Sequence, residues 1–214
     1  MNTKEHALAA TRTLPDLGEE LRNITLHYFN DANALLNERE ALFYKKIEVV
    51  GVKLNLVHMV LGLAGELGEI VNCTGTQLKL KIDLPNLKEE LGDIYWYLSN
   101  YCTLRNVPIP DSHALKINIQ TDDCFELLIS SISDLVDLVK RYVAYGKDIE
   151  IPKEYETVYD IYSALFMFET TYNIDGDEIR QKNIDKLKKR YPEKFSNDLA
   201  INRDLDSERS VFES

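Results

Sequence analysis

The chain has 214 residues, of which 44% are hydrophobic, and a formal net charge of −11 at pH 7. This hydrophobic content argues against general disorder, and an acidic chain without a basic patch is not expected to bind nucleic acid. The N-terminus lacks a signal pattern and no apolar run reaches the ~20 residues of a membrane span, so we expect a soluble cytoplasmic protein without a membrane partner.

Apolar residues recur at three- and four-residue spacings along most of the chain, and no segment alternates with period two, so the sequence predicts an all-α fold. Asn86 is the predicted N-cap of the third helix, with Glu89 at its third helical position. Pro192 is expected to end the last helix. We expect one domain over 1–196 and a flexible polar tail over 197–214. Helices are predicted at 16–46, 52–74, 87–105, 111–118, 122–146, 153–172 and 175–190.

Two parts of the chain resemble each other at nearly one sequence shift. AGELGEIV (64–71) aligns with ISDLVDLV (132–139), LGDIYWYL (91–98) with VYDIYSAL (158–165), and KINI (116–119) with QKNI (181–184). Helical patterning inflates such matches, but three of them in order predict an internal duplication. The chain would then be a pseudo-dimer, with a first copy over 52–118 and a degenerate second copy over 122–195.

Two acidic pairs stand inside apolar segments. Glu66 and Glu69 lie in LVHMVLGLAGELGEIV, and Glu90 and Asp93 lie in LKEELGDIYWYL. Residues three apart share one face of a helix, so two antiparallel helices could turn all four carboxylates inward. Carboxylates that close would repel one another and raise their pKa values. A cation is therefore expected between them, and hard oxygen ligands suit Mg²⁺, with Mn²⁺ as the alternative.

Other interpretations of these acids are weaker. A single ExxE pair is usually a solvated helix face, but here glycines at 62, 65, 68 and 92 accompany both pairs and indicate close helix approach or room for a ligand. A di-iron site in a helical bundle would require Glu-x-x-His on two helices. No histidine occupies such a position, and His58 lies eight residues before Glu66.

The two acidic segments, followed by KNIDKLKKRYPEKF, resemble the MazG-like all-α nucleoside triphosphate pyrophosphohydrolases. The resemblance covers about 52–105 and 175–195. The chain departs from the family in the long segment between these ranges, which the second copy fills. The ExxE–spacer–ExxD signature is met by Glu66, Glu69, Glu90 and Asp93, and an ending common in phage and bacterial members is met by Asn183, Lys186, Leu187, Arg190, Tyr191 and Pro192.

The resemblance implies Mg²⁺-dependent hydrolysis of a (deoxy)nucleoside triphosphate to the monophosphate and pyrophosphate, which would serve nucleotide-pool control. Glu66 or Glu69 would orient the attacking water as the catalytic base. The family builds its sites between paired two-helix units, in a homodimer or within a fused chain. Candidate phosphate contacts are Lys79, Lys81, Lys186 and Arg190, and candidate base contacts are His58, Tyr97 and Asn183.

Three points stay open at this stage. Each candidate substrate contact could instead be an ordinary surface or core residue. The enzyme could be a dUTPase-like or dCTPase-like member of the same superfamily. A helical module that binds nucleotides without hydrolysing them is the alternative from a different functional class.

In the second copy, Asp134, Asp137 and Asp160 align with three of the acids, but Thr157 aligns with Glu90, so that copy lacks one ligand.

Overall fold

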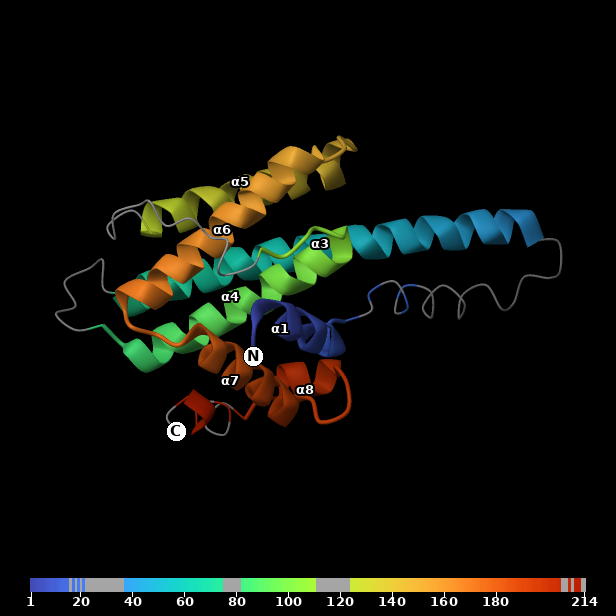
Figure 1. Cartoon of the computed structure of the whole chain (residues 1–214). Helices are drawn as coiled ribbons and strands as arrows, with labels where there is room; N and C mark the ends of the chain where they lie inside the picture. The colour runs from blue at the N-terminus through green and yellow to red at the C-terminus, as the bar shows by residue number, and fades with distance from the viewer. Residues whose placement is uncertain are drawn as a thin grey trace.

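The computed structural model describes residues 1–15, 17, 19, 21, 37–74, 82–110, 124–204, 208 and 210–212, with the backbone alone for 37–44. Every regular element in this part of the chain is a helix, which confirms the all-α prediction (Figure 1). The elements are α1 (Thr3–Ala10), the 3-10 turn η1 (Thr11–Thr13), α3 (Asn37–Thr74), α4 (Leu84–Arg105), α5 (Cys124–Tyr145), α6 (Ile151–Thr171), α7 (Gly176–Arg190) and α8 (Asn197–Ile201).

Helix α3 is continuous where the sequence analysis predicted two helices, 16–46 and 52–74. The predicted break between them is wrong, because the segment IEVVGVK (47–53) is helical throughout. A single glycine such as Gly51 costs a helix interior only about 1 kcal/mol relative to alanine, which is too little to end a long helix by itself. Most of 16–36 and all of the predicted helix 111–118 lie outside the described residues.

Helix α4 begins at Leu84, before the predicted start at 87. Its N-cap is Asp83, whose side chain accepts a hydrogen bond from the Asn86 backbone N–H at 3.4 Å. Pro85 stands in the first turn, where its fixed φ suits the helix and its missing N–H leaves no helical bond unmade. The predicted cap, Asn86, instead donates from Nδ2 to Cys73 Sγ at 3.2 Å, which joins the start of α4 to the end of α3.

Four long helices form two antiparallel pairs, α3 with α4 and α5 with α6, and α3 also packs against α5 (Figure 1). Their buried apolar side chains belong to one core, which includes Leu56, Leu91, Leu135 and Leu165. Two hairpins side by side are the arrangement that a duplication would produce, but an ordinary four-helix bundle has it too. The internal duplication therefore stays a prediction.

Helices α1 and α7 cover the opposite side of α4, and they also contact each other. Helix α1 was not predicted. A capping box starts it: the Asn2 side chain accepts from the Glu5 backbone N–H, and the Glu5 carboxylate accepts from the Asn2 N–H. Helix α7 begins after the N-cap Asp175 and ends at Arg190, as predicted. Helix α4 is consequently enclosed on several sides, and most of its length is buried.

In the segment 197–214, expected to be a flexible polar tail, some of the described residues are helical and two of the later ones, Glu208 and Phe212, are buried. Helix α8 begins it, and the later residue Glu208 is only 3% exposed. Its carboxylate accepts from the guanidinium groups of Arg190 and Arg203, which explains why an acidic side chain is buried there. The composition of the tail suggested a loose segment, but these ion pairs hold it against α7.

One stretch of α3, Lys45–Thr74, is long and apolar enough to cross a membrane by length and composition. Core helices of soluble proteins meet the same criteria, and 33% of the apolar window of this stretch is buried inside the protein.

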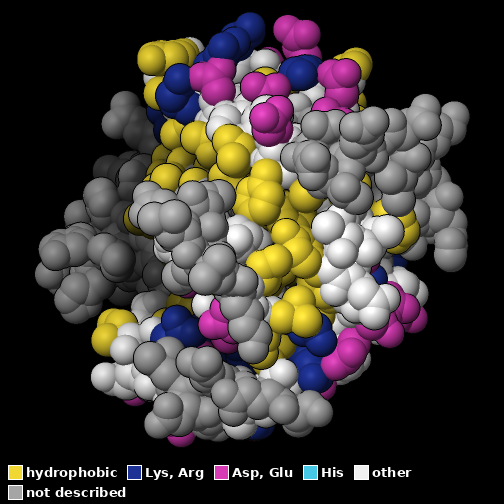
Figure 2. All heavy atoms as spheres, turned by 90° about the vertical axis from the view of Figure 1, so that its left-hand side faces the viewer, with side chains coloured by type: hydrophobic (Ala, Val, Ile, Leu, Met, Phe, Trp, Pro, Cys, Tyr) yellow, Lys and Arg dark blue, Asp and Glu magenta, His cyan; other side chains and the backbone are white. Residues whose placement is uncertain are grey.

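On the end of the molecule that lies at the left of Figure 1, hydrophobic side chains form a band with charged side chains above and below it (Figure 2).

Candidate functional site

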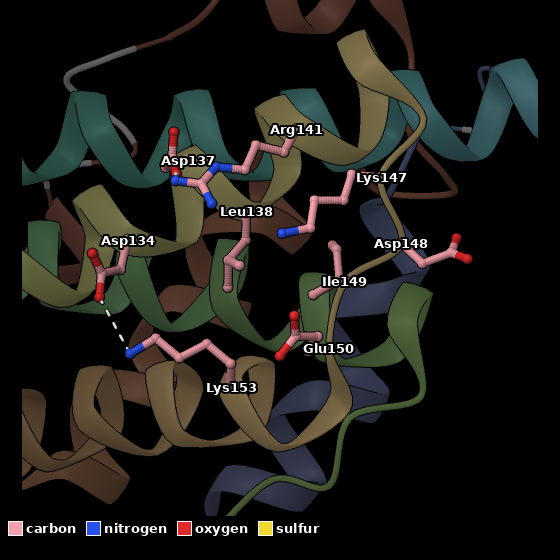
Figure 3. Close-up of a pocket in the computed structure, with 9 residues that line it drawn as sticks. All are labelled: Asp134, Asp137, Leu138, Arg141, Lys147, Asp148, Ile149, Glu150 and Lys153. Carbon is pink, nitrogen blue, oxygen red and sulfur yellow. Dashed lines mark ion pairs between the residues drawn. The ribbon is translucent and has the colours of Figure 1, made fainter.

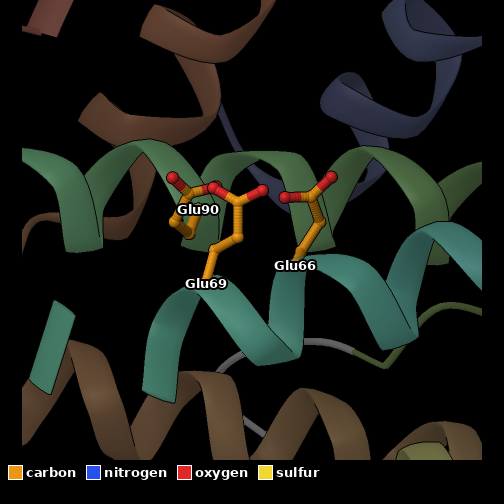
Figure 4. Close-up of side chains that lie close together, drawn as sticks. All are labelled: Glu66, Glu69 and Glu90. Carbon is orange, nitrogen blue, oxygen red and sulfur yellow. The ribbon is translucent and has the colours of Figure 1, made fainter. Parts of the chain in front are cut away.

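Glu66 and Glu69 on α3 face Glu90 on the neighbouring helix α4, and the three carboxylates point toward one another (Figure 4). One oxygen of each lies within 4.8 Å of the others. Glu90 is 6% exposed, Glu66 is half-buried and Glu69 is exposed, so the cluster reaches from the interior to the surface. We refer to these three residues as the glutamate cluster. Within the described part of the chain, it is the one such group of potential metal ligands.

Two carboxyl groups of the glutamate cluster, those of Glu66 and Glu90, lie too close to other acids and too deep in the protein to ionise as readily as free glutamates. Burial, and next the charge of Asp93, raise the pKa of Glu66 to about 7 and that of Glu90 to about 9. The two carboxyl groups also hydrogen-bond to each other. Like charges in a desolvated place retain a proton in this way. A divalent cation could take the place of that proton, because it would remove the same repulsion.

Asp93, the predicted fourth ligand, lies beside the cluster and is held by two side chains of α7. Lys186 Nζ lies 2.7 Å from Asp93 Oδ1 and 2.6 Å from Oδ2, and Asn183 Nδ2 donates to Oδ1 at 2.6 Å. Lys186 also reaches Glu89 Oε1 at 3.3 Å. Two residues predicted to contact substrate therefore contact a predicted metal ligand.

Lys186 is 1% exposed, so its ammonium group is almost completely removed from water. Burial lowers the pKa of Lys186, but the charges of Asp93 and Glu89 outweigh burial and bring the pKa above its usual value. The lysine consequently stays charged opposite the Asp93 side chain.

A pocket of about 290 Å³ opens next to the glutamate cluster and is lined by Glu66, Asp93 and several aromatic rings. His58 and Tyr97, both predicted to contact the base, line it edge to face with ring centroids 5.8 Å apart. Trp96 also lines it, and its Nε1–H donates to Thr13 Oγ1 at 2.9 Å. The rest of the lining comes mainly from the C-terminal part of the chain: Leu187, Arg190, Tyr191, Phe195, Ala200 and Arg203.

The glycines beside the acidic pairs have two different roles. A Cβ atom at Gly62 would lie 2.2 Å from the Tyr97 ring, and one at Gly92 would lie 3.1 Å from Asn183 Cβ. These two glycines allow close approach of the elements that build the site. A Cβ atom at Gly65 or Gly68 would meet no atom within 4 Å, so these positions face open space. Close approach of the helices, one of the two sequence interpretations, is therefore seen at Gly62 and Gly92, and room for a ligand stays a prediction.

The predicted phosphate contacts are distributed unevenly. Arg190 lines the pocket while it is ion-paired with Glu208. Lys79 and Lys81 lie outside the described residues. Arg203, which the sequence analysis did not select, also lines the pocket and donates to Glu208 at 2.8 Å. No local signal marks Arg203, because it lies in a segment of tail-like composition. Tyr191 belongs to the C-terminal motif, whereas Phe195 follows the end of α7 and carries no helical spacing signal.

Asp134 and Asp137 on α5, predicted to correspond to Glu66 and Glu69, have different surroundings. Asp137 pairs with Lys140 at 2.5 Å and with Arg141, both on its own helix, and Asp134 lies 3.5 Å from Lys153 of α6 (Figure 3). A separate pocket of about 190 Å³ at the connection between α5 and α6 is lined by Asp134, Asp137, Arg141 and Lys153, but not by Lys140. The positive charges beside Asp134 and Asp137 are therefore lysine and arginine side chains of the protein, and no metal ion is required to balance these two acids.

Helices α3 and α4, together with the C-terminal part of the chain, thus bring together three glutamates, a fourth carboxylate and an aromatic pocket with arginines at its edge. Such a site could hold a divalent cation and, next to it, a ligand with a planar ring and negative charges. The resemblance to the MazG-like enzymes rests on the motifs alone. Comparison with models of known protein families, with characterised proteins and with solved structures finds no match to this chain.

Proposed function

We propose that the chain is a Mg²⁺- or Mn²⁺-dependent enzyme that hydrolyses a nucleoside triphosphate to the monophosphate and pyrophosphate, in the manner of the MazG-like enzymes. The observation that carries the proposal is the glutamate cluster at the edge of an aromatic pocket. A metal site alone would suit many functions. A metal site beside aromatic rings and arginines suits a substrate that has a base and a polyphosphate.

The donor set fits a hard divalent cation. Glu66, Glu69 and Glu90 offer carboxylate oxygens from two rigid helices, and Asp93 stands next to them as the proposed fourth ligand. The raised pKa values of Glu66 and Glu90 indicate that the cluster without a cation is electrostatically unfavourable. When bound, the ion would neutralise phosphate charge and make a water molecule more acidic.

The other residues are assigned by their position in the pocket. Tyr97, His58 and Tyr191 offer ring faces and edges to a base. Arg190 and Arg203 offer guanidinium groups that suit phosphate oxygens, which would then compete with the Glu208 carboxylate. Glu66 or Glu69 would orient the attacking water, since both belong to the cluster and neither is fully buried.

The test is a panel of ribonucleoside and deoxyribonucleoside triphosphates with Mg²⁺, with release of pyrophosphate as the measurement. We expect release with at least one nucleotide and none from Glu90→Gln. A marked preference for dUTP or dCTP would select the specialised alternative within the superfamily. Metal binding without release from any nucleotide would contradict the proposal and favour a nucleotide-binding module. Release of orthophosphate instead would contradict the assigned bond cleavage.

A further inference from the structure

A chain of buried side chains leads from helix α1 to Asp93. His6 Nδ1 lies 3.2 Å from Ser99 Oγ on α4, and His6 Nε2 lies 3.3 Å from Asn183 Oδ1 on α7. Asn183 then donates from Nδ2 to Asp93 Oδ1 at 2.6 Å. His6, Ser99 and Asn183 are each 0% exposed. Side chains from three helices are therefore linked to one carboxylate through Asn183, and the three residues that lead to it are inaccessible to water.

The direction of each hydrogen bond follows from Asp93, the last residue in this series of hydrogen bonds. A carboxylate only accepts, so the Asn183 amide nitrogen must face Asp93 and its oxygen must face His6. The histidine consequently has to donate from Nε2. Burial lowers the pKa of His6 to about 4, so the ring is neutral at pH 7 and its other nitrogen, Nδ1, is an acceptor. Ser99 donates its hydroxyl hydrogen to that nitrogen.

We propose that His6 is a positioning residue for the metal site: through its Nε2–H it holds the Asn183 amide in the one orientation that donates to Asp93. This inference rests on the proposed function, since Asp93 is there the fourth ligand. If His6 could not donate, the Asn183 amide would be free to turn its oxygen toward Asp93, where two acceptors would repel. Lys186 would then hold the carboxylate alone.

The backbone supports this arrangement. Gly92 precedes Asp93, and a Cβ atom at Gly92 would lie 3.1 Å from Asn183 Cβ and 3.4 Å from its Nδ2. The absence of that side chain lets α7 approach α4 closely enough for the short Asn183–Asp93 hydrogen bond. Helix α1 then closes over the pair with His6, whose ring lies edge to face against Tyr95 with centroids 6.2 Å apart.

Two conservative variants separate a positioning role from a packing role. In His6→Gln, the side-chain amide nitrogen takes the place of Nε2 and keeps a donor for Asn183. In His6→Asn, the shorter side chain keeps a polar group near Ser99 and loses the donor to Asn183. The measurements are Mn²⁺ affinity by electron paramagnetic resonance, pyrophosphate release, and the melting temperature of each full-length variant.

We expect His6→Asn to lose about tenfold in Mn²⁺ affinity or in kcat/KM, the lower end of what outer partners of metal ligands contribute. His6→Gln should stay within about threefold of the wild type in both quantities, since it keeps a hydrogen-bond donor to Asn183 Oδ1. Equal losses in the two variants, or losses that follow only the melting temperature, would overturn the positioning role.

The tautomer provides a readout that needs neither metal nor turnover. In ¹⁵N-labelled protein at pH 7, the imidazole signals assigned to His6 should show the hydrogen on Nε2. A hydrogen on Nδ1 would overturn the inference directly. Mn²⁺ binding with the expected difference between Gln and Asn, but no pyrophosphate release from any nucleotide, would reject the proposed function and leave the positioning role supported. A wild-type protein that binds no Mn²⁺ would overturn both.

Discussion

The hairpins α3–α4 and α5–α6 carry acids at the same helical spacing but in opposite electrostatic surroundings. Asp137 has Lys140 and Arg141 three and four residues later on its own helix. At the corresponding positions after Glu69 stand Asn72 and Cys73. An acidic pair with its own cations requires no bound ion, whereas the glutamate cluster retains a proton in place of one. The comparison teaches that the neighbours of an acidic pair, more than its spacing, distinguish a metal site from a solvated face.

The largest expected effect is loss of turnover in Glu90→Gln. This substitution preserves the shape of a buried ligand and removes its charge, so it should lower the rate by at least about a thousandfold, or roughly 4 kcal/mol of transition-state stabilisation. Pyrophosphate release measures it, and circular dichroism checks that the helices remain. Turnover at the wild-type rate would remove Glu90 from the ligand set.

The second prediction compares the two hairpins directly. Glu66→Ala and Asp93→Ala should abolish activity. Asp134→Ala and Asp137→Ala should leave it within about threefold, because Asp134 is exposed, Asp137 is only half-buried, and both are paired with nearby cations. The same nucleotide panel serves for all four variants. Equal losses from Glu69→Ala and Asp137→Ala would show that the second hairpin also contributes a working site.

The third prediction concerns stabilisation by metal. Binding to the folded state alone stabilises a protein by about 2.7 kcal/mol at a hundred times the dissociation constant. For a chain of this size, we expect the melting temperature to rise by about 5–10 °C in saturating Mg²⁺ or Mn²⁺. The rise should disappear in Glu90→Gln and persist in Asp137→Ala. A melting curve that does not respond to millimolar metal would count against the glutamate cluster as a metal site.

The smallest effect is a pH dependence that only the first hairpin should show. In EDTA, the folded pKa values of Glu66 and Glu90, about 7 and about 9, exceed the unfolded value of 4.5. The folded state then binds more protons, so its stability is greatest below pH 4.5 as far as these groups are concerned and declines as pH rises through 7 and 9. The slope is at most about 1.4 kcal/mol per pH unit for each extra proton.

Urea unfolding between pH 7 and 9 measures this slope, above the range in which His6 titrates. Glu90→Gln should remove most of it, because the variant lacks the carboxyl group that deprotonates near pH 9. Asp137→Ala is the matched control from the second hairpin and should leave it unchanged. An apoprotein whose stability is constant over this range would show that Glu66 and Glu90 ionise without mutual cost.

Much of the glutamate cluster could be predicted from local sequence. Three-residue spacing places Glu66 and Glu69 on one face of α3 whatever surrounds the helix, because helical geometry is set by the backbone. The ends of α4 and α7 at Arg105 and Arg190 were predicted as well, since prolines and other end signals act within a few residues. The continuous α3 was missed because a single glycine is a weak signal.

Only the tertiary structure decided which side chains accompany Asp93. Asn183 is 90 residues away from it in the chain and His6 lies on a helix that the sequence analysis did not predict. Glu208 pairs with Arg190 of α7, and Arg203 pairs with Glu208, from a segment whose composition predicts a loose tail. Periodicity determines the face on which a residue lies within its own helix, but not the helix that will pack against that face. That choice depends on the burial of the whole core and on the pairing of charges within it.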